Sequence, residues 1–483
     1  LYIDVDSLRP DHLGCYGYHR NTSPTIDAIA QESRRFTNVY VSDAPCLPSR
    51  TALWSGRNGF HTGVVGHGGT ASQPFIEGTD RDFADVFRQT GWMSALRNTG
   101  LKTVAISSFA ERHSAWHWYA GYNEIYNTGK GGMETADDIN TIALDWFQHN
   151  ANDDNWFLHI NYWDPHTPYR TPEAYGNPFK DEPIADWYTQ EMLDKCLSSY
   201  GPHSALEPHH HTDLDAWEHY PRLPQWIDTM DAVKQWVDGY DIGVRYMDDH
   251  LAAVIQALKD ADVYDETVII ISADHGENLG ELNVWGDHQT ADQFTSRVPL
   301  IVRFPGITKG GDVDDGLRYQ FDWAATLIEL LGGEVPDNWD GQSFVSVFKQ
   351  QETDERPYLV ISQNAWSCQR SIRFGKYLCI RTYHDGLKDF PEVMLFDLDT
   401  DPHEQNNIAD AHPEVVAQAM IYLADWHAEM MATSQTNIDP MMTVLREGGP
   451  FHTRGIAEGL IERLNAMGAH EQANLLRQRV EDQ

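Results

Sequence analysis

Five short apolar runs that stop abruptly at polar residues constrain the fold of this chain more than any other feature. The runs read "LYIDVDS", "KTVAISS", "NWFLHINYWDPHTPY", "ETVIIISADHGE" and "RVPLIVRFPG", and the first and fourth reach Asp6 and Asp274. Strands that are apolar throughout are typical of a parallel sheet covered by helices on both faces. Ligands of such sheets gather beyond the carboxyl ends of the strands. We therefore expect the polar clusters to form one site.

Helical patterns separate these runs. In "YMDDHLAAVIQALKDADVYDET", Met247, Leu251, Ile255 and Leu258 fall on one stripe directly before the fourth run. Spacings of three and four residues are typical of a helix with one apolar face, and strands that alternate with helices define an α/β fold. We predict a large mixed, mostly parallel sheet flanked by helices, with a smaller C-terminal domain made of an antiparallel sheet and a helix.

The character of the sequence changes after about residue 350, which divides the chain into three parts. We predict an N-terminal α/β domain over residues 1–350, a small α+β subdomain over 351–435 and a helical tail over 436–483. The tail either packs back on the main domain or contacts a second subunit. Within the first domain, residues 170–240 are predicted to be a loop-rich insertion or lid. Its histidine run, "PHHHT", indicates either metal ligands or, more simply, a solvated loop.

Charge and cysteine content exclude several classes of function. The chain has 35 Lys+Arg against 73 Asp+Glu, a formal net charge of -38. Nucleic-acid binding needs a basic face, so it is not expected, although a small anion can bind where Arg and His residues converge. Five scattered cysteines form neither a disulfide scaffold nor a zinc–cysteine motif. No apolar run is long enough to span a bilayer. We expect a soluble protein without membrane contact; the cytoplasm is favoured, and the periplasm and secretion stay open.

Asp6 and Asp274 are candidate metal ligands. Each follows an apolar run, and the two runs are far apart in the chain. Either residue alone would be an ordinary helix cap or turn residue. Together, next to His275, they offer the carboxylate oxygens that hard divalent cations prefer. His275 is either a third ligand or a brace for the carboxylates, and we favour the ligand.

Cys46 lies in "DAPCLPSRTALWSG", ahead of a helix that we predict to begin around Ser49. That position is the positive end of the helix dipole, where anions bind and nucleophiles are activated. Arg50 is placed to hold an anionic oxygen with two hydrogen bonds. Cys46 is therefore either a reactive group or a buried structural thiol; the residues alone favour the reactive group only slightly.

The segment "CLPSRTALWSG" resembles the sulfatase signature C-x-P-S-R-x-x-L-x-[ST]-G at every fixed position. Four further segments resemble the same family in the same order: "DVDSLRPDHLGCYGY", "NYWDPHTPY", "YMDDHLAAVIQALKDADVYDETVIIISADHGENLGE" and "LFDLDTDPHEQNNIA". The likeness covers nearly the whole chain. The chain is thus identified as similar to the type I sulfatases of the alkaline phosphatase-like superfamily.

This resemblance implies a specific chemistry. A maturation enzyme oxidises the cysteine matched by Cys46 to formylglycine, guided by the proline and arginine that follow. One hydroxyl of the hydrated aldehyde attacks the sulfur of a sulfate ester, and the other later expels inorganic sulfate. The metal is typically calcium, with Mg²⁺ or Mn²⁺ as alternatives, and it orients the sulfate. Asp6, Asp274, His275 and the group at Cys46 match its ligand positions, and Arg50 matches the arginine that anchors the nucleophile.

Other candidate residues follow from the same resemblance. His166 matches a histidine near the sulfate or the leaving-group oxygen. Ser7 stands where many relatives have a second aspartate, so it is at most a weak ligand. Asp287 stands where a lysine is common, which leaves His288 as the hydrogen-bond donor. Two further pairs of candidates remain. Arg112 and His113 replace a missing Lys-x-His element, and His452 and Arg454 of "GGPFHTRG" either close over a substrate anion or pack the tail or a subunit contact.

The resemblance implies a sulfuric ester hydrolase that acts on a sulfated sugar or small oligosaccharide. Trp187, Trp217 and Trp226 of the insertion either stack on a sugar ring or pack in the core. The alternative enzyme is a phosphonate monoester or phosphodiester hydrolase with the same nucleophile. A binding protein with an inert site is disfavoured, because Cys46 and Asp274 are both present. Self-association is left open.

Overall fold

The computed structural model describes residues 1–77, 86–209, 216–349 and 355–482. Its main feature is a nine-stranded sheet with the order β11-β2-β10-β7-β1-β6-β4-β5, with β12 also paired to β2. The strands are β1 (Tyr2–Val5), β2 (Arg34–Tyr40), β4 (Lys102–Ile106), β5 (Glu124–Tyr126), β6 (Trp156–Tyr162), β7 (Ile269–Ser272), β10 (Arg297–Arg303), β11 (Asp312–Asp314) and β12 (Arg318–Tyr319). The run β7-β1-β6-β4-β5 is parallel throughout. The predicted mixed, mostly parallel sheet is confirmed.

One strand runs against the expectation of a parallel array. The segment "RVPLIVRFPG" forms β10, which is antiparallel to both β7 and β2. A parallel neighbour needs a crossover that carries the chain back to the other end of the sheet. The connection from β7 to β10 contains only the short strands β8 (Asn278–Leu279) and β9 (Trp285–Asp287), the turn η7 (Glu281–Asn283) and the short helix α11 (Gln293–Ser296).

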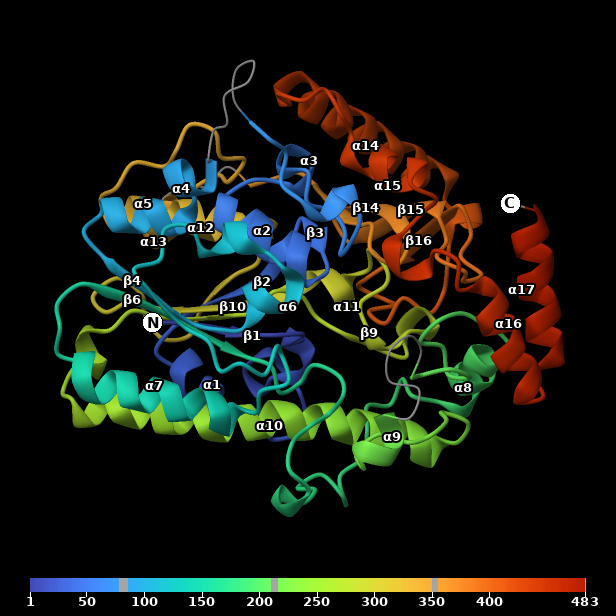
Figure 1. Cartoon of the computed structure of the whole chain (residues 1–483), viewed down its shortest axis with the longest axis horizontal. Coiled ribbons are helices and arrows are strands. Elements are labelled where there is room, and N and C mark those ends of the chain that lie inside the picture. The colour runs from blue at the N-terminus through green and yellow to red at the C-terminus, as the bar shows by residue number, and fades with distance from the viewer. Residues whose placement is uncertain (78–85, 210–215, 350–354, 483) are drawn as a thin grey trace.

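Helices cover both faces of this sheet (Figure 1). One layer holds α1 (Pro24–Ala30), α7 (Ala136–Asn150) and α10 (Met230–Asp260); the other holds α2 (Cys46–Ser55), α4 (Val86–Thr90), α5 (Trp92–Asn98), α12 (Gln320–Leu330) and α13 (Val345–Phe348). The stripe predicted on α10 is buried, with Met247, Leu251 and Leu258 at 0% exposure. Under the second layer, the ring of Tyr2 lies edge-on to Trp92, with centroids 5.6 Å apart.

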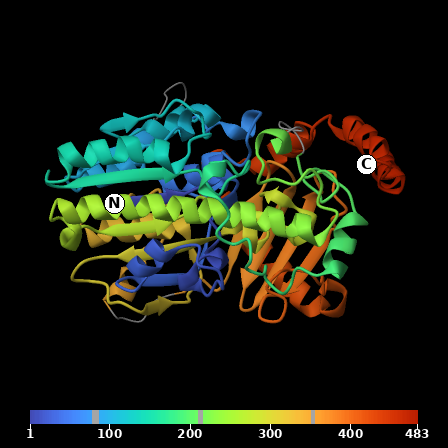
Figure 2. The ribbon, with the colours of Figure 1, turned by 90° about the horizontal axis from the view of Figure 1, so that it is seen from below.

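A second, smaller sheet lies beside the first (Figures 1 and 2). Its order is β16-β15-β14-β13-β3, from β16 (Val393–Asp397), β15 (Tyr377–His384), β14 (Cys368–Phe374), β13 (Leu359–Gln363) and β3 (Asp43–Ala44). Helix α14 (Pro413–Thr433) packs on it through Leu423 and Trp426. The last strand comes from the N-terminal part of the chain. β3 runs parallel to β13, with Ala44 opposite Gln363, so the segment directly before Cys46 belongs to the second sheet.

The insertion and the tail close the arrangement. The insertion contains α8 (Gln190–Leu197), α9 (Ala216–His219) and the start of α10; His210 and His211 of its histidine run lie outside the described residues, as does the predicted boundary near 350. The tail forms α15 (Pro440–Arg446), η9 (Phe451–Thr453), α16 (Ala457–Ala466) and α17 (His470–Asp482). Leu460 and Leu476 of the tail pack against Tyr200 and Leu387. Within the described ranges, no helix combines the length and the apolar character that a membrane crossing requires.

Candidate active site

The carboxyl ends of β1 and β7 bring two distant acidic residues together. The two strands are adjacent and parallel, with Ile3 opposite Ile271. Asp6 directly follows β1 and Asp274 follows β7 by one residue, so both side chains lie at the same edge of the sheet. One ligand atom from each of Asp6, Cys46, Asp274 and His275 lies within 4.8 Å of the others. The predicted convergence of these four residues is present in the structure.

Arg50 forms ion pairs with a group of buried carboxylates. Its Nη2 lies 3.1 Å from Asp6 Oδ2 and its Nε lies 3.2 Å from Asp274 Oδ2. Its Nη1 donates to a third carboxylate, Asp4 Oδ2, at the end of β1. Asp4 also contacts His159 Nε2 at 2.9 Å. The sequence placed Arg50 beside an anionic oxygen, and the structure gives it three carboxylate partners, all buried.

This cluster fits a divalent cation. Three carboxylates and one guanidinium leave two negative charges when all are ionised, and an uncompensated buried charge is costly. Burial raises the pKa of Asp274; Arg50 opposes the shift and the neighbouring Asp6 carboxylate adds to it. Asp274 Oδ2 accepts no hydrogen bond from the described residues. Ca²⁺ and Mg²⁺ bind oxygen ligands such as carboxylates, and one carboxylate oxygen here has no hydrogen-bond partner in the described part of the chain. The residues present therefore suit such an ion.

Cys46 is the first residue of α2, so the helix begins three residues earlier than predicted. Pro48 was taken to precede the helix, but it sits in the first turn. The first four N–H groups of a helix have no partner within the helix, so a proline there costs no hydrogen bond. Cys46 therefore lies on the helix end itself, and Gly56 ends the helix at a φ of 66°.

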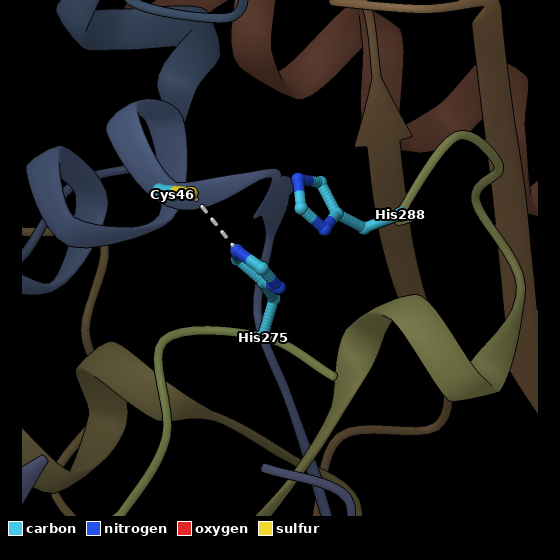
Figure 3. Close-up of side chains that lie close together, drawn as sticks. All are labelled: Cys46, His275 and His288. Carbon is cyan, nitrogen blue, oxygen red and sulfur yellow. Dashed lines mark hydrogen bonds between the residues drawn. The ribbon is translucent and has the colours of Figure 1, made fainter. Parts of the chain in front are cut away.

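The Cys46 side chain faces two histidines (Figure 3). Its Sγ lies 3.1 Å from His275 Nε2, and the rings of His275 and His288 are 4.2 Å apart. The thiol is only 2% exposed. Burial, with Asp6 and Asp274 close by, raises the pKa of Cys46 well above its ordinary value. Activated cysteines have a lowered pKa, so the thiol itself is not a ready nucleophile in this arrangement.

A cavity of about 550 Å³ opens above Cys46. Seven histidines are among the described residues that line it: His67, His113, His166, His203, His209, His288 and His452. Arg112, Asp287, Trp236 and Trp366 complete the polar and aromatic part of the wall. Burial lowers the pKa of His166 to about 3. Burial also lowers the pKa of His67, His113 and His288. These histidines thus offer neutral rings, and Arg112 supplies the positive charge among the described lining residues.

Most predicted substrate residues line this cavity; the exception is Arg454, and Ser7, predicted as a weak metal ligand, lies elsewhere. Arg112, His113, His166, Asp287, His288 and His452 are all part of its wall. Arg454 is not among the lining residues; its Nη2 pairs with Glu447 at 3.0 Å and its Nε donates to Gly449 O at 2.6 Å. Ser7 lies under the cluster, where its N–H donates to Asp274 and its Oγ donates to Asp6. Ser7 therefore positions both carboxylates.

Sequence reasoning missed three residues of the wall. His67 Nε2 accepts from the Leu47 N–H at 3.5 Å, and His67 Nδ1 lies 3.1 Å from His452 Nε2. His203 Nε2 lies 3.1 Å from Asp287 Oδ2. Trp366 stacks on His452, with ring centroids 4.6 Å apart. Only His67 carried a local signal, because it is flanked by glycines in "VVGHGG".

The carboxylate cluster makes a prediction about stability. Replacing Arg50 by methionine leaves three buried carboxylates without their cation, so the free energy of unfolding of the metal-free protein should fall by about 3–5 kcal/mol. Arg245→Met is the control, because Arg245 forms a surface pair with Asp249, and losing such a pair costs less than about 1 kcal/mol. Urea denaturation of both variants measures the difference. Equal losses would contradict the cluster's role.

Comparisons with known proteins identify the family. The Sulfatase family model matches residues 1–333, and a model of the C-terminal part of N-sulphoglucosamine sulphohydrolase matches residues 280–427. The N-acetylglucosamine-6-O-sulfatase of Bacteroides thetaiotaomicron is 23% identical over 473 residues, which cover 84% of this chain and 82% of that protein.

Two solved structures share the fold. One is a protein in complex with its substrate, D-glucosamine-2-N,6-O-disulfate. It matches with a TM-score of 0.70 and 19% identity, over 91% of this chain and 98% of that chain. The other is a phosphonate monoester hydrolase from Silicibacter pomeroyi, with a TM-score of 0.67, 19% identity and coverage of 92% and 96%. The family match over residues 1–333 makes this chain a member of the sulfatase family of the alkaline phosphatase-like superfamily, and a sulfatase enzyme.

Proposed function

We propose that this sulfatase releases inorganic sulfate from a sulfated sugar or small oligosaccharide, with a formylglycine made from Cys46 as the nucleophile. The observation that carries the proposal is the convergence of ligand atoms from Cys46, Asp6, Asp274 and His275 within 4.8 Å of one another, with Cys46 also lining one cavity. A nucleophile and an oxygen-rich cation site side by side suit the transfer of an anionic group.

Two groups complete the site in this proposal. Asp6, Asp274 and His275 would hold calcium or another divalent cation, and a maturation enzyme would convert Cys46. When present, the cation supplies neutralisation of the sulfate charge, and hydrated formylglycine supplies the attacking hydroxyl. Cys46 is buried, so conversion by another enzyme is proposed to precede folding of this segment.

The chain's own residues have separate tasks around these groups. Arg50 holds the carboxylates in place through three contacts. His166 Nδ1 donates to Thr167 O, which leaves its Nε2 facing the cluster, 4.0 Å from Asp6. We propose that His113 and His288 donate hydrogen bonds to the sulfate or leaving-group oxygens, that the unprotonated Nε2 of neutral His166 accepts from a substrate hydroxyl, and that Arg112 supplies positive charge at the wall. Asp287 orients His203, and His452 closes the tail side of the cavity.

The names of the relatives support a sugar substrate. One relative is an N-acetylglucosamine-6-O-sulfatase, and one solved structure of the same fold holds a disulfated glucosamine. Trp236 and Trp366 add aromatic surface to the wall, and such surface suits a ring with an apolar face. A panel of singly sulfated mono- and disaccharides, assayed for released sulfate, identifies the substrate.

A phosphonate monoester or phosphodiester hydrolase is the second candidate, because one such enzyme shares the fold over 92% of this chain. We expect the matured protein to hydrolyse an aryl sulfate with a kcat/KM at least about tenfold above that of the matched aryl phosphonate monoester, a difference of about 1.4 kcal/mol in the barrier. Both esters share one leaving group, so release of the phenol measures both. A preference for the phosphonate would favour the second candidate.

A further inference from the structure

A second cavity, of about 310 Å³, lies between the insertion and the tail helix α16. Its described lining residues are Glu207, Pro208, His209, Trp217, Gln225, Trp226, Arg463, Ala466 and Met467. We call it the Trp226 cavity. The sequence left two alternatives for its Trp217 and Trp226, stacking on a sugar ring or packing in the core, and the active site described above does not use this cavity.

The Trp226 cavity lies next to the active-site cavity. Pro208 and His209 line both, so they form the wall between them. His209 is fixed in this wall: its Nε2 lies 2.8 Å from Pro224 O, and its ring is 5.8 Å from that of Trp236, which lines the active-site cavity. A ligand that fills the first cavity therefore meets the second at this wall.

The lining combines an aromatic floor with a polar rim. Trp226 is 41% exposed, although large aromatic side chains gain by burial. Trp217 is half-buried beside it. At the rim, Arg463 forms an ion pair with Glu207, and Gln225 adds an amide. A sugar ring has an apolar face of C–H groups and an edge of hydroxyls, which matches this combination of a few placed polar groups on apolar walls.

The wall also contains a part of the chain that the family models do not reach. The two matches end at residues 333 and 427, whereas Arg463, Ala466 and Met467 belong to or directly follow α16. The tail thus contributes to this cavity residues that lie outside both family models, and differences between related enzymes are expected where they select different substrates.

We propose that the Trp226 cavity binds the sugar ring next to the sulfated ring, so that the preferred substrate is a sulfated oligosaccharide of at least two rings. This inference rests on the proposed function. The neighbouring ring does not react, so its contacts stabilise ground state and transition state alike. Such contacts lower KM and leave kcat unchanged.

The test compares two probes on the matured enzyme: N-acetylglucosamine 6-sulfate, and a disaccharide with the same sulfated ring at its non-reducing end. We expect a KM about tenfold lower for the disaccharide at equal kcat, as one stacking contact of about 1.4 kcal/mol gives. Trp226→Ala should remove this advantage and leave the monosaccharide unchanged. Met467→Ala, which alters the opposite wall, should reduce the advantage in part.

Trp116→Ala is the matched control, because Trp116 is 61% exposed and lines neither cavity; it should keep the full advantage. Thermal melts verify that each variant is folded. Equal KM values for the two sugars, or a Trp226→Ala variant that keeps the difference, would overturn the inference alone. A gain for a long-chain alkyl sulfate but not for the disaccharide would overturn it in favour of an apolar occupant. Absence of sulfate release from both sugars would overturn the proposed function and the inference with it.

Discussion

Replacing Cys46 by alanine should abolish sulfate release while the protein remains folded. Cys46 lies at the meeting point of α2, the carboxylates and the cavity, and alanine lacks the thiol that the maturation enzyme would convert to an aldehyde. Loss of a nucleophile typically lowers kcat by on the order of 10⁴-fold or more. The removed sulfur is one buried atom, so the free energy of unfolding should fall by only about 1 kcal/mol. Released sulfate and a thermal melt measure the two effects.

Cys379→Ala separates the role of Cys46 from the loss of any buried thiol. Cys379 is also fully buried, on β15 in the second sheet, packed in the cluster under α14. It should lose a similar amount of stability and keep its activity. Peptide mass spectrometry of the Cys46 segment, after co-expression with a maturation enzyme, should find formylglycine in the active wild type. Wild-type turnover by Cys46→Ala, or by protein whose Cys46 is entirely thiol, would contradict the assignment.

Asp274→Asn should lower metal affinity and turnover together. The amide keeps the shape of the side chain and removes the charge that faces the cation, and changes around metal ligands cost about 10–100-fold in affinity even one shell away. We expect a loss of at least about 100-fold in affinity and a comparable loss in kcat/KM. Metal content after dialysis and calorimetric titration with Ca²⁺ measure binding without turnover. Treatment of the wild type with a chelator should reproduce the loss, and added cation should restore it.

Asp248→Asn is the matched control for this experiment. Asp248 is a fully buried carboxylate that accepts from the N–H groups of Thr25 and Ile26, and it lies outside the active-site cavity. The Asp248→Asn variant should bind the cation and release sulfate like the wild type. Full activity of a metal-free Asp274→Asn preparation would remove the cation from the proposed function.

The sequence predicts those features of the fold that follow from a regular spacing of apolar residues along a strand or helix. Apolar runs that end on Asp6 and Asp274 predicted strands and one shared edge, because parallel strands end at the same side of a sheet. The α10 stripe was predicted from its spacing and is buried. The sequence predicted a mixed sheet but did not identify β10 as the antiparallel strand, because the direction of a strand depends on its connection rather than on its own residues. The start of α2 was wrong by three residues, because a proline is tolerated in the first turn.

Contacts between loops have no such pattern in the sequence. His203 meets Asp287 from the insertion, and His452 meets His67 from the tail. These pairs are 84 and 385 residues apart in the chain, and no periodicity links them. One partner of Arg50, Asp4, was equally hidden, since it lies within an apolar strand. The roles of these residues remain predictions until variants test them.

The pairing of β3 with β13 makes the proposed active site depend on both sheets. Ala44 lies opposite Gln363, and the Ser362 N–H donates to Ser42 O at 2.9 Å, only a few residues before Cys46, the proposed nucleophile position. Truncating the chain ahead of β13 would remove the only strand that pairs with β3 in that sheet among the described strands. The start of α2 would then lose its support. An excised N-terminal half should therefore be inactive even if it folds into a compact state. Proteolytic cleavage between the two sheets should abolish activity before the protein unfolds.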